Sequence, residues 1–276
     1  MPSEITVRSA NWHLTDRCNY TCVFCFMQTL PGREAGRERG RKIMDTLARL
    51  GVTKLNFVGG EPMLHPLLPE FAAYARQKGF TVSMVTNGSL LNEAKIMELR
   101  PNMDWLGISV DSAFEGTEIG LGRGHGRHIA HAREVCRLAR EAGMKLKLNT
   151  VVTKLNFQED MRPLVRDLDP LRWKVFQMLL VAGQNDAGVT LATTSEEFEI
   201  FRKTNADLIL GSGQKPVFEA GEDMVDSYLM LAPDGGIIAN SRHHYRFIPL
   251  KEVEARGLSG IVSERAYVDR GGVYDW

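Results

Sequence analysis

Short apolar or β-branched runs alternate with longer segments of helical period along the first two thirds of the chain. The runs cover residues 11–15, 54–58, 80–86, 105–110, 145–152 and 172–180. Apolar positions between them recur every three to four residues, which predicts helices over 37–50, 66–78, 91–99, 126–142 and 159–168. Strands that alternate with helices indicate a parallel sheet with right-handed crossovers. The sequence therefore predicts an α/β fold, a partial TIM-like barrel of six strand-helix units.

The pattern becomes less regular after residue 182. The segment 183–194 has the composition of a loop, and a capped helix is expected to begin near Ser195. The runs DSYLML and GGIIAN predict a hairpin that closes the barrel. We divide the chain into a partial barrel, 1–182, and a carboxy-terminal extension, 183–276, within one compact unit.

The composition narrows the possible functions. The chain has 276 residues, of which 43% are hydrophobic, so it can bury a sizeable core. Lysine plus arginine and aspartate plus glutamate each number 34, so no net charge attracts nucleic acid or anionic lipid. Residues 1–10 lack a basic stretch followed by an apolar run, and no segment is long and apolar enough to span a bilayer. We expect a soluble, cytoplasmic protein without a membrane or nucleic-acid partner.

Three of the four cysteines lie within the eight residues CNYTCVFC. Cys18, Cys22 and Cys25 follow the first predicted strand, so they should lie on a loop at the catalytic mouth of the barrel. Their clustering indicates metal rather than disulfides. The cysteines alone leave two cofactors open: zinc completed by a fourth ligand such as His13, or a [4Fe–4S] cluster with one open iron. The fourth cysteine, Cys136, lies among apolar residues of a predicted helix and is expected to be a buried thiol.

Polar residues follow the next three predicted strands. The second strand ends in GGEP, where paired glycines permit close approach of the backbone and Glu61 offers a carboxylate to an amino group. Asn87 follows the third strand, and Ser109 and Asp111 end the fourth. Each could belong to an ordinary turn. Together, opposite a loop with three cysteines, they predict a binding site.

Charged side chains lie on predicted strands that ought to be apolar on both faces. The side chains that share a face are Lys54 with Asn56, Lys145 with Lys147 and Asn149, and Arg172 with Lys174. They could extend from strand ends to water. Alternatively, several cations that converge inside a barrel require a polyanion, for which a triphosphate is the obvious candidate. The glycine-rich segment 120–128, which contains Arg123, and the segment 270–272 are candidate phosphate loops.

CxxxCxxC followed by GGEP resembles the radical S-adenosylmethionine (SAM) superfamily. The resemblance implies a [4Fe–4S] cluster on the three cysteines of the loop, with the amino and carboxylate groups of SAM on the remaining iron. Reduction of the cluster would cleave SAM and release a 5′-deoxyadenosyl radical. The residues implied to contact the cofactor are Phe24, Gly59, Gly60, Glu61, Asn87, Ser109, Asn149 and Val151.

Longer motifs, among them NWHLTDRCNYTCVFCF, KLNFVGGEP, KLNTVVTKLNFQEDM and RWKVFQMLL, resemble the viperin and viperin-like family over nearly the whole chain. The resemblance implies an antiviral radical dehydratase that converts a ribonucleoside triphosphate, CTP, to its 3′-deoxy-3′,4′-didehydro analogue, a chain terminator. UTP or GTP as substrate, or a metal-binding protein without turnover, are the alternatives. The residues implied to hold the nucleotide are Lys54, Arg123, Lys147 and Lys174; Asn149 is placed beside the ribose and SAM, and Tyr228 is implied as the hydrogen or proton donor.

The resemblance also implies two partners, and it has limits. The partners are an external one-electron reductant and iron-sulfur assembly machinery that reads Trp276 at the chain end. The amphipathic membrane segment of animal viperin has no counterpart here, so membrane attachment is not expected. Val58 stands where the best-known members have a hydroxyl residue, and the tail after residue 272 is shorter than theirs. These differences bear on base preference and on the phosphate loop formed by the tail.

Overall fold

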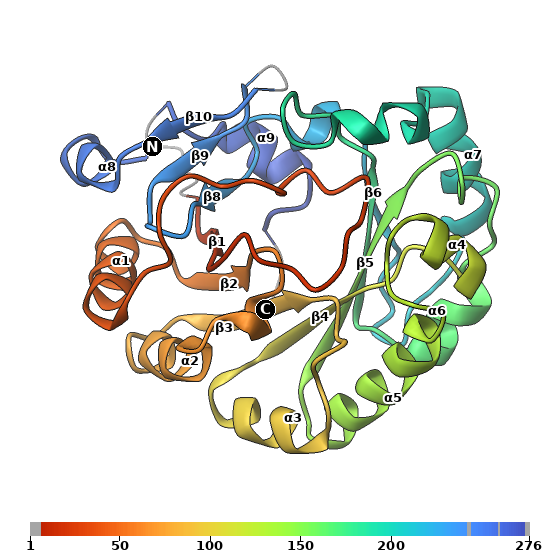
Figure 1. The fold of residues 1–276 in the computed structure, drawn as a ribbon, viewed down its shortest axis with the longest axis horizontal. Helices are drawn as coiled ribbons and strands as arrows, with labels where there is room; N and C mark the ends of the chain where they lie inside the picture. The colour runs from red at the N-terminus through yellow and green to blue at the C-terminus, as the bar shows by residue number, and fades with distance from the viewer. Residues whose placement is uncertain (1–6, 242–243, 259, 274–276) are drawn as a thin grey trace.

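A single curved sheet organises the computed structural model, which describes residues 7–241, 244–258 and 260–273 (Figure 1). Its strands lie in the order β10-β9-β8-β1-β2-β3-β4-β5-β6-β7. The strands are β1 (Ser9–His13), β2 (Lys54–Val58), β3 (Thr81–Thr86), β4 (Trp105–Ser109), β5 (Lys145–Val152), β6 (Arg172–Gln177), β7 (Val217–Glu219), β8 (Leu229–Leu231), β9 (Ile237–Ala239) and β10 (Arg246–Ile248). All neighbours from β8 to β7 pair in parallel, whereas β8, β9 and β10 pair antiparallel.

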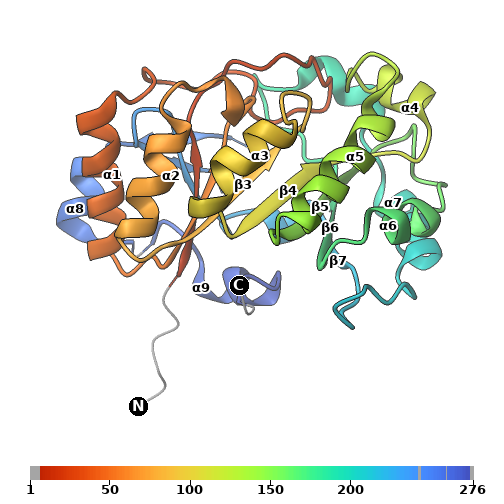
Figure 2. The same cartoon turned by 90° about the horizontal axis from the view of Figure 1, so that it is seen from below.

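Helices cover the outer face of this sheet, as expected for right-handed crossovers (Figures 1 and 2). The α-helices of the described residues, not all of which lie on that face, are α1 (Arg37–Arg49), α2 (Leu68–Gln77), α3 (Glu93–Leu99), α4 (Glu115–Gly120), α5 (His128–Glu141), α6 (Arg162–Leu168), α7 (Ser195–Asn205), α8 (Leu250–Arg256) and α9 (Glu264–Asp269). Figure 2 shows α9 at the end of the sheet opposite the loop between β1 and α1. Among the described residues, no helix is both long and apolar enough to cross a membrane.

The six predicted strand-helix units are confirmed. The strands β2 and β5 have the predicted bounds, while β1 begins two residues earlier than expected and β6 ends at Gln177 rather than 180. The expected capped helix is α7, whose N-cap Thr194 and Glu197 form a capping box. The short elements β7, β10, α4, α8 and α9 were not predicted, because three to seven residues carry too little periodicity.

The core lies between the sheet and its helices, whereas the inner face of the sheet carries the polar groups. Trp12 on β1 is fully buried and stacks on Phe71 of α2, with ring centroids 5.2 Å apart. Along β5, Leu146 and Leu148 are buried beneath the helices, and the alternate positions face the interior of the barrel. Polar residues at those alternate positions therefore line the site.

The predicted closure of the barrel by a hairpin is wrong in its detail. β8 and β9 do form an antiparallel hairpin, with Met230 opposite Ile238. The hairpin extends the sheet beyond β1, and within the described residues no strand pairing joins it to β7. Side chains bridge the gap instead, since Tyr228 before β8 donates a hydrogen bond to Glu219 at the end of β7. The sheet is thus an open barrel whose last gap is filled by polar side chains.

Candidate functional site

A cavity of about 270 Å³ opens at the carboxyl ends of the parallel strands. The segment between β1 and α1, red in Figure 1, crosses the open end of the sheet. This segment contributes all three clustered cysteines to the cavity wall, and β5 contributes Lys147, Asn149 and Val151. Residues of a strand advance about 3.3 Å each, so Lys147 and Val151 lie roughly 13 Å apart along the wall. The wall therefore runs from thiols at the mouth to cations deep in the barrel.

The cysteine loop is paired with the glycine-rich loop that precedes α5. The amides of Thr21 and Val23 donate to the carbonyls of Gly122 and Leu121, at 3.2 and 3.1 Å. Gly122 has a φ of +77°, and a Cβ there would collide with the carbonyl oxygen of Thr21. Only glycine permits this close approach in the left-handed conformation. The glycine-rich loop is thus a support for the cysteines.

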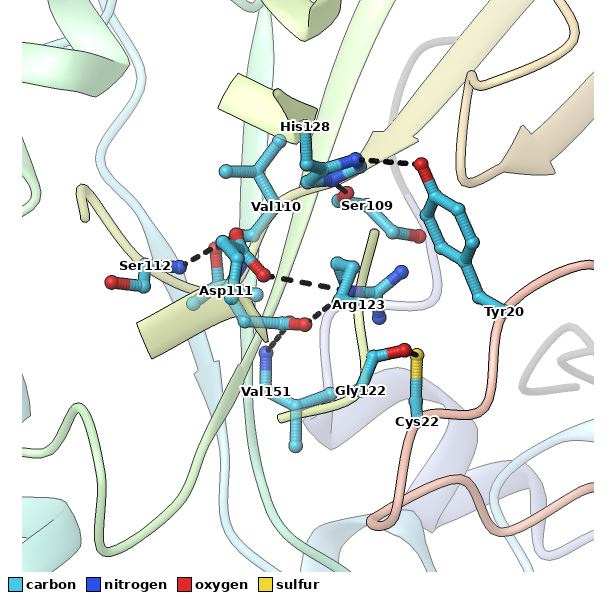
Figure 3. Close-up of polar contacts among 12 residues, drawn as sticks. Tyr20, Cys22, Ser109, Val110, Asp111, Ser112, Gly122, Arg123, His128 and Val151 are labelled. Carbon is cyan, nitrogen blue, oxygen red and sulfur yellow. Dashed lines mark hydrogen bonds and ion pairs between the residues drawn. The ribbon is translucent and has the colours of Figure 1, made fainter. Parts of the chain in front are cut away.

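Two further observations argue against the expectation that segment 120–128 binds phosphate. Glu115 already caps α5: its carboxylate accepts hydrogen bonds from the amides of His128 and Ile129, each at 2.9 Å. A capped helix start no longer offers its amides to an anion. Arg123 forms an ion pair with Asp111 on the side of the site where Cys22 lies (Figure 3).

Arg123 is held by two buried carboxylates (Figure 3). Its Nε contacts Asp111 and lies 3.8 Å from Glu118, and its guanidinium lies 5.3 Å from the ring centroid of Phe24. Within the described residues, neither of its terminal nitrogens donates a hydrogen bond. Burial and the neighbouring charge of Asp111 raise the pKa of Glu118 to about 8. The arrangement directs a fixed guanidinium toward the cysteine end of the cavity.

The thiols lie in surroundings suited to a bound cluster. Burial raises the pKa of Cys22 to about 12, while the positive charge of Arg123 opposes this rise. Metal ligands must be thiolates, so occupation of the site would release protons. Among the described residues, no three His, Cys, Asp or Glu side chains converge on one point as a single metal ion requires. The three thiols instead line one cavity wall.

Glu61 of GGEP has a different surrounding from the one expected. It is fully buried, and its oxygens accept hydrogen bonds from the Thr86 hydroxyl at 2.6 Å and the Asn87 amide at 2.9 Å. It does not line the cavity. Glu61 therefore fixes the ends of β2 and β3, and the adjacent Gly59 and Gly60, which do line the cavity, pack against the start of the cysteine loop.

The other residues expected to contact the cofactor lie together. All of them line the cavity: Phe24, Gly59, Gly60, Asn87, Ser109, Asn149 and Val151. Asn87 is held by Asn19, to which its amide donates at 2.9 Å. The Oδ1 atom of Asn149 is buried and has no hydrogen-bond partner among the described residues. An orphaned acceptor between the thiols and the lysines is the group that a bound ligand would satisfy.

The deep end of the cavity is strongly cationic. Lys147 and Lys174 line it, while Lys54 and Arg172 are buried nearby. Burial, together with the charges of these neighbours, lowers the pKa of Lys54 to about 6 and that of Lys147 to about 7. Burial also lowers the pKa of Lys174, but only to about 8, because the negative charge of Glu219 partly offsets the loss of water. Cations that give up protons in the unliganded protein form a site for an anion.

Tyr228 lies at this cationic end, beside two groups that the sequence analysis singled out and one that it missed. Its hydroxyl accepts a hydrogen bond from Lys174 at 2.7 Å and donates one to Glu219 at 2.5 Å. The guanidinium of Arg270 lies 3.6 Å from the ring centroid of Tyr228. Arg270, the first residue of the segment 270–272, thus packs on Tyr228. No sequence pattern indicated Glu219, because it ends a strand of three residues.

Three expectations concern other parts of the chain. Cys136 is buried on α5, as expected for a structural thiol. Val58 lines the cavity, so the position that differs from the best-known family members faces the site. Trp276 lies outside the described residues.

Comparisons of sequence identify relatives of the chain. The Radical SAM superfamily matches residues 12–168. An S-adenosylmethionine-dependent nucleotide dehydratase of a Thermoplasmatales archaeon is 36% identical over 270 residues, covering 98% of this chain and 96% of the relative. The enzyme of the same description from Flammeovirga pacifica is 34% identical over 98% of this chain and 96% of its own length. That of Danio rerio is 35% identical over 98% of this chain and 79% of its own.

Solved structures share the fold. SuiB of Streptococcus suis bound to S-adenosylmethionine superposes with a TM-score of 0.66 at 16% identity, over 83% of this chain and 59% of SuiB. The chain thus spans less than two thirds of that protein. The enzyme anSMEcpe with bound AdoMet gives a TM-score of 0.64 at 16% identity, over 84% of this chain and 73% of its own.

The fold, the cysteine loop and these matches define a radical SAM enzyme, a class that uses a [4Fe–4S] cluster and SAM. Within that class, the chain belongs to the family of S-adenosylmethionine-dependent nucleotide dehydratases, the viperin family. The resemblance seen in the motifs is confirmed. The zinc site that the cysteines alone left open and the alternative of a metal-binding protein without turnover are both set aside.

We predict that Gly122→Ala weakens both the fold and the cluster site. A side chain in the left-handed conformation costs about 1–3 kcal/mol, and here it also presses on the cysteine loop. The temperature of thermal unfolding and the iron content after anaerobic reconstitution should both be lower than in the parent. Gly116→Ala is the control: it lies in α4 with no atom within 4 Å of the added Cβ, so stability should rise by up to about 1 kcal/mol. Full iron content and parental stability in Gly122→Ala would show that the loop pairing is dispensable.

We also predict that Lys147→Met stabilises the ligand-free fold, by on the order of 1–3 kcal/mol at pH 7. The folded pKa of Lys147 is lowered to about 7, so the unfolded chain binds more protons between that value and the ordinary value of 10.5. The gain should therefore be largest below pH 7 and vanish as the pH approaches 10.5. Lys145→Met, at the exposed start of the same strand, should change stability by less than about 0.5 kcal/mol. Chemical denaturation at several pH values measures both, and a destabilised Lys147→Met would assign this lysine to the fold.

Proposed function

We propose that this enzyme removes water from a ribonucleoside triphosphate, CTP, to give the 3′-deoxy-3′,4′-didehydro nucleotide. One observation carries the proposal: Val151, Asn149 and Lys147 face the same cavity from one strand, between a cysteine loop and a cluster of buried cations. A nucleotide with its phosphates among the cations would have its ribose near Asn149. The reacting sugar would then lie between the phosphate site and the cofactor site.

The residues present fit the two cofactors of the class. Cys18, Cys22 and Cys25 would hold the [4Fe–4S] cluster, and the guanidinium of Arg123 and the orphaned Oδ1 of Asn149 would contact SAM. When bound, these cofactors supply a 5′-deoxyadenosyl radical that removes the hydrogen from C4′ of the ribose. The apolar ring of Phe24 on the same wall would keep water from this part of the cavity.

The cations of the deep end would bind the phosphates. Lys147 and Lys174 line the cavity, and Lys54 adds positive charge behind them. Arg123 was expected in this group, but its ion pair with Asp111 favours the cofactor end. A charge-assisted hydrogen bond contributes roughly 1.5–3 kcal/mol when desolvated, so several of them favour a triphosphate over shorter phosphate chains.

The second half of the reaction requires a proton and an electron. After C4′ loses its hydrogen, departure of the 3′-hydroxyl as water takes up one proton and one electron, and the C3′–C4′ double bond forms. Tyr228 and Lys174, hydrogen-bonded to each other, are the proton donors at the sugar. The electron comes from an external one-electron reductant. The product lacks the 3′-hydroxyl that a polymerase extends, so it would terminate viral nucleic-acid synthesis.

Base choice and cluster delivery are the remaining parts of the proposal. UTP and GTP are the alternatives to CTP, and Val58 on the cavity wall is a position at which polar contacts would differ from those of the best-known family members. Trp276 would be read by iron-sulfur assembly machinery rather than take part in the chemistry. Removal of Trp276 should then lower iron content after expression but not activity after chemical reconstitution.

The test is anaerobic turnover with SAM and dithionite in an equal mixture of CTP, UTP, GTP and ATP, followed by mass spectrometry. The expected result is one nucleotide that is 18 mass units lighter, the mass of water, together with 5′-deoxyadenosine. Alanine at any of Cys18, Cys22 or Cys25 should abolish both products, because the cluster needs all three thiolates. A reconstituted enzyme that cleaves SAM but dehydrates none of the four nucleotides would refute the proposal.

We predict that CTP binding takes up protons near pH 7.5. The lysines at the deep end have lowered pKa values, about 7 for Lys147 and about 8 for Lys174, and a polyanion raises them. Affinity should therefore be greatest below pH 7 and fall as the pH rises through 8. Calorimetry in two buffers of different ionisation enthalpy measures the proton uptake. Release of protons, or affinity that is constant between pH 6.5 and 9, would contradict the assignment.

A further inference from the structure

Three polar side chains from three different elements meet at the open gap of the barrel. They are Lys174 on β6, Glu219 at the end of β7 and Tyr228 before β8. The Lys174 ammonium donates to the Tyr228 hydroxyl at 2.7 Å and forms an ion pair with Glu219, and the Tyr228 hydroxyl donates to Glu219 at 2.5 Å. Each pair is in contact, so the three side chains form a closed triangle.

The members of this triangle differ in their access to the cavity. Lys174 and Tyr228 line it, whereas Glu219 is fully buried and does not. Glu219 is thus placed to act on a bound molecule only through its two partners. A buried carboxylate beside a phosphate site would repel the ligand if it faced it, so its position behind Lys174 and Tyr228 is the one compatible with an anionic substrate.

Most of the other charged groups around Lys174 are cations. They are Arg172 on the same strand, Arg270 after α9, Lys147 on β5 and Lys54 on β2. Burial and these cations favour a neutral Lys174, and Glu219 opposes them. An ammonium has three donors. Tyr228 and Glu219 engage two of them, so one N–H is left for a ligand in the cavity.

We propose that Glu219 is the positioning residue of the proposed dehydratase: it keeps Lys174 charged and holds the Tyr228 hydroxyl in place beside Lys174. The inference rests on the proposed function, because it concerns how the same site binds phosphate and handles the proton at the sugar. In Glu219→Gln, the amide cannot balance the ammonium. The side-chain NH₂ of the glutamine would also compete with Lys174 as donor to Tyr228, whose hydroxyl hydrogen would then need another acceptor.

The experiment measures CTP affinity against pH, from 6.5 to 9.5, on the reconstituted anaerobic holoenzyme with SAM and without reductant. In the parent, affinity should fall as Lys174 loses its proton above pH 8. In Glu219→Gln, this fall should occur about one pH unit lower, because an opposite charge in contact shifts a pKa by about one to three units. Glu219→Asp keeps the charge and should move the midpoint back toward that of the parent.

Two further variants separate position from packing. Tyr228→Phe removes the hydroxyl but leaves the Lys174 and Glu219 pair, so turnover should fall at least about tenfold while the pH midpoint of CTP binding stays at the parental value. Glu118→Gln changes an equally buried carboxylate that faces Arg123 instead, so the pH midpoint should again be parental.

The outcomes are distinguishable. A parental pH midpoint in Glu219→Gln overturns the inference, as does an equal shift in Tyr228→Phe or Glu118→Gln. If Glu219→Gln does not fold, Glu219→Asp is the deciding variant. A parental pH profile of CTP affinity together with a parental kcat supports the role of the negative charge at position 219. A shifted profile together with a reduced kcat overturns the inference. A parent that binds CTP at no pH refutes the proposed function rather than the role of Glu219.

Discussion

Lysines on the inner face of a parallel sheet are held out of water, and the layout of the site follows from the free energy that this burial costs. Parallel strands flanked by helices are ordinarily apolar on both faces. Here β5 is apolar only toward its helices, and toward the interior it presents Lys147 and Asn149. Burial and the charges of neighbouring cations lower the pKa of such a lysine, as in Lys54. Glu219 supplies one internal negative charge, and an anionic substrate would supply the others.

The opposite end of the cavity depends on backbone packing instead. The cysteine loop has little regular structure of its own between β1 and α1, so its shape is set by what it touches. Gly60 lets the second strand approach it from one side, and Gly122 lets the loop before α5 approach it from the other. Arg123 enters on the same segment as Gly122 and brings positive charge to the thiols. The adjacent residues Gly122 and Arg123 thus supply part of the support of the cysteine loop and the positive charge beside its thiols.

Much of the fold and part of the site could be predicted from the sequence. Strand-helix alternation identified β1 to β6, because each strand and helix carries its own period, and cysteine spacing identified the loop. Partners across the barrel could not be predicted. Glu61 reads as an exposed acceptor, yet Thr86 and Asn87 occupy its oxygens; Arg123 reads as a phosphate ligand, yet Asp111 holds it. Such pairings depend on strand order and crossover geometry, which local patterns do not encode.

The gap between β7 and β8 links the fold to the candidate site. A backbone ladder across it would fix the distance between the strands and remove their exposed edges. Instead, Lys174, Glu219 and Tyr228 span it, and two of the three also face the cavity. The groups that fill this gap are therefore also the groups that would meet a nucleotide in the proposed site. A change of charge at this gap acts on the fold and on the anion site together, whereas a change at the cysteine end acts mainly on the loop that bears the thiols.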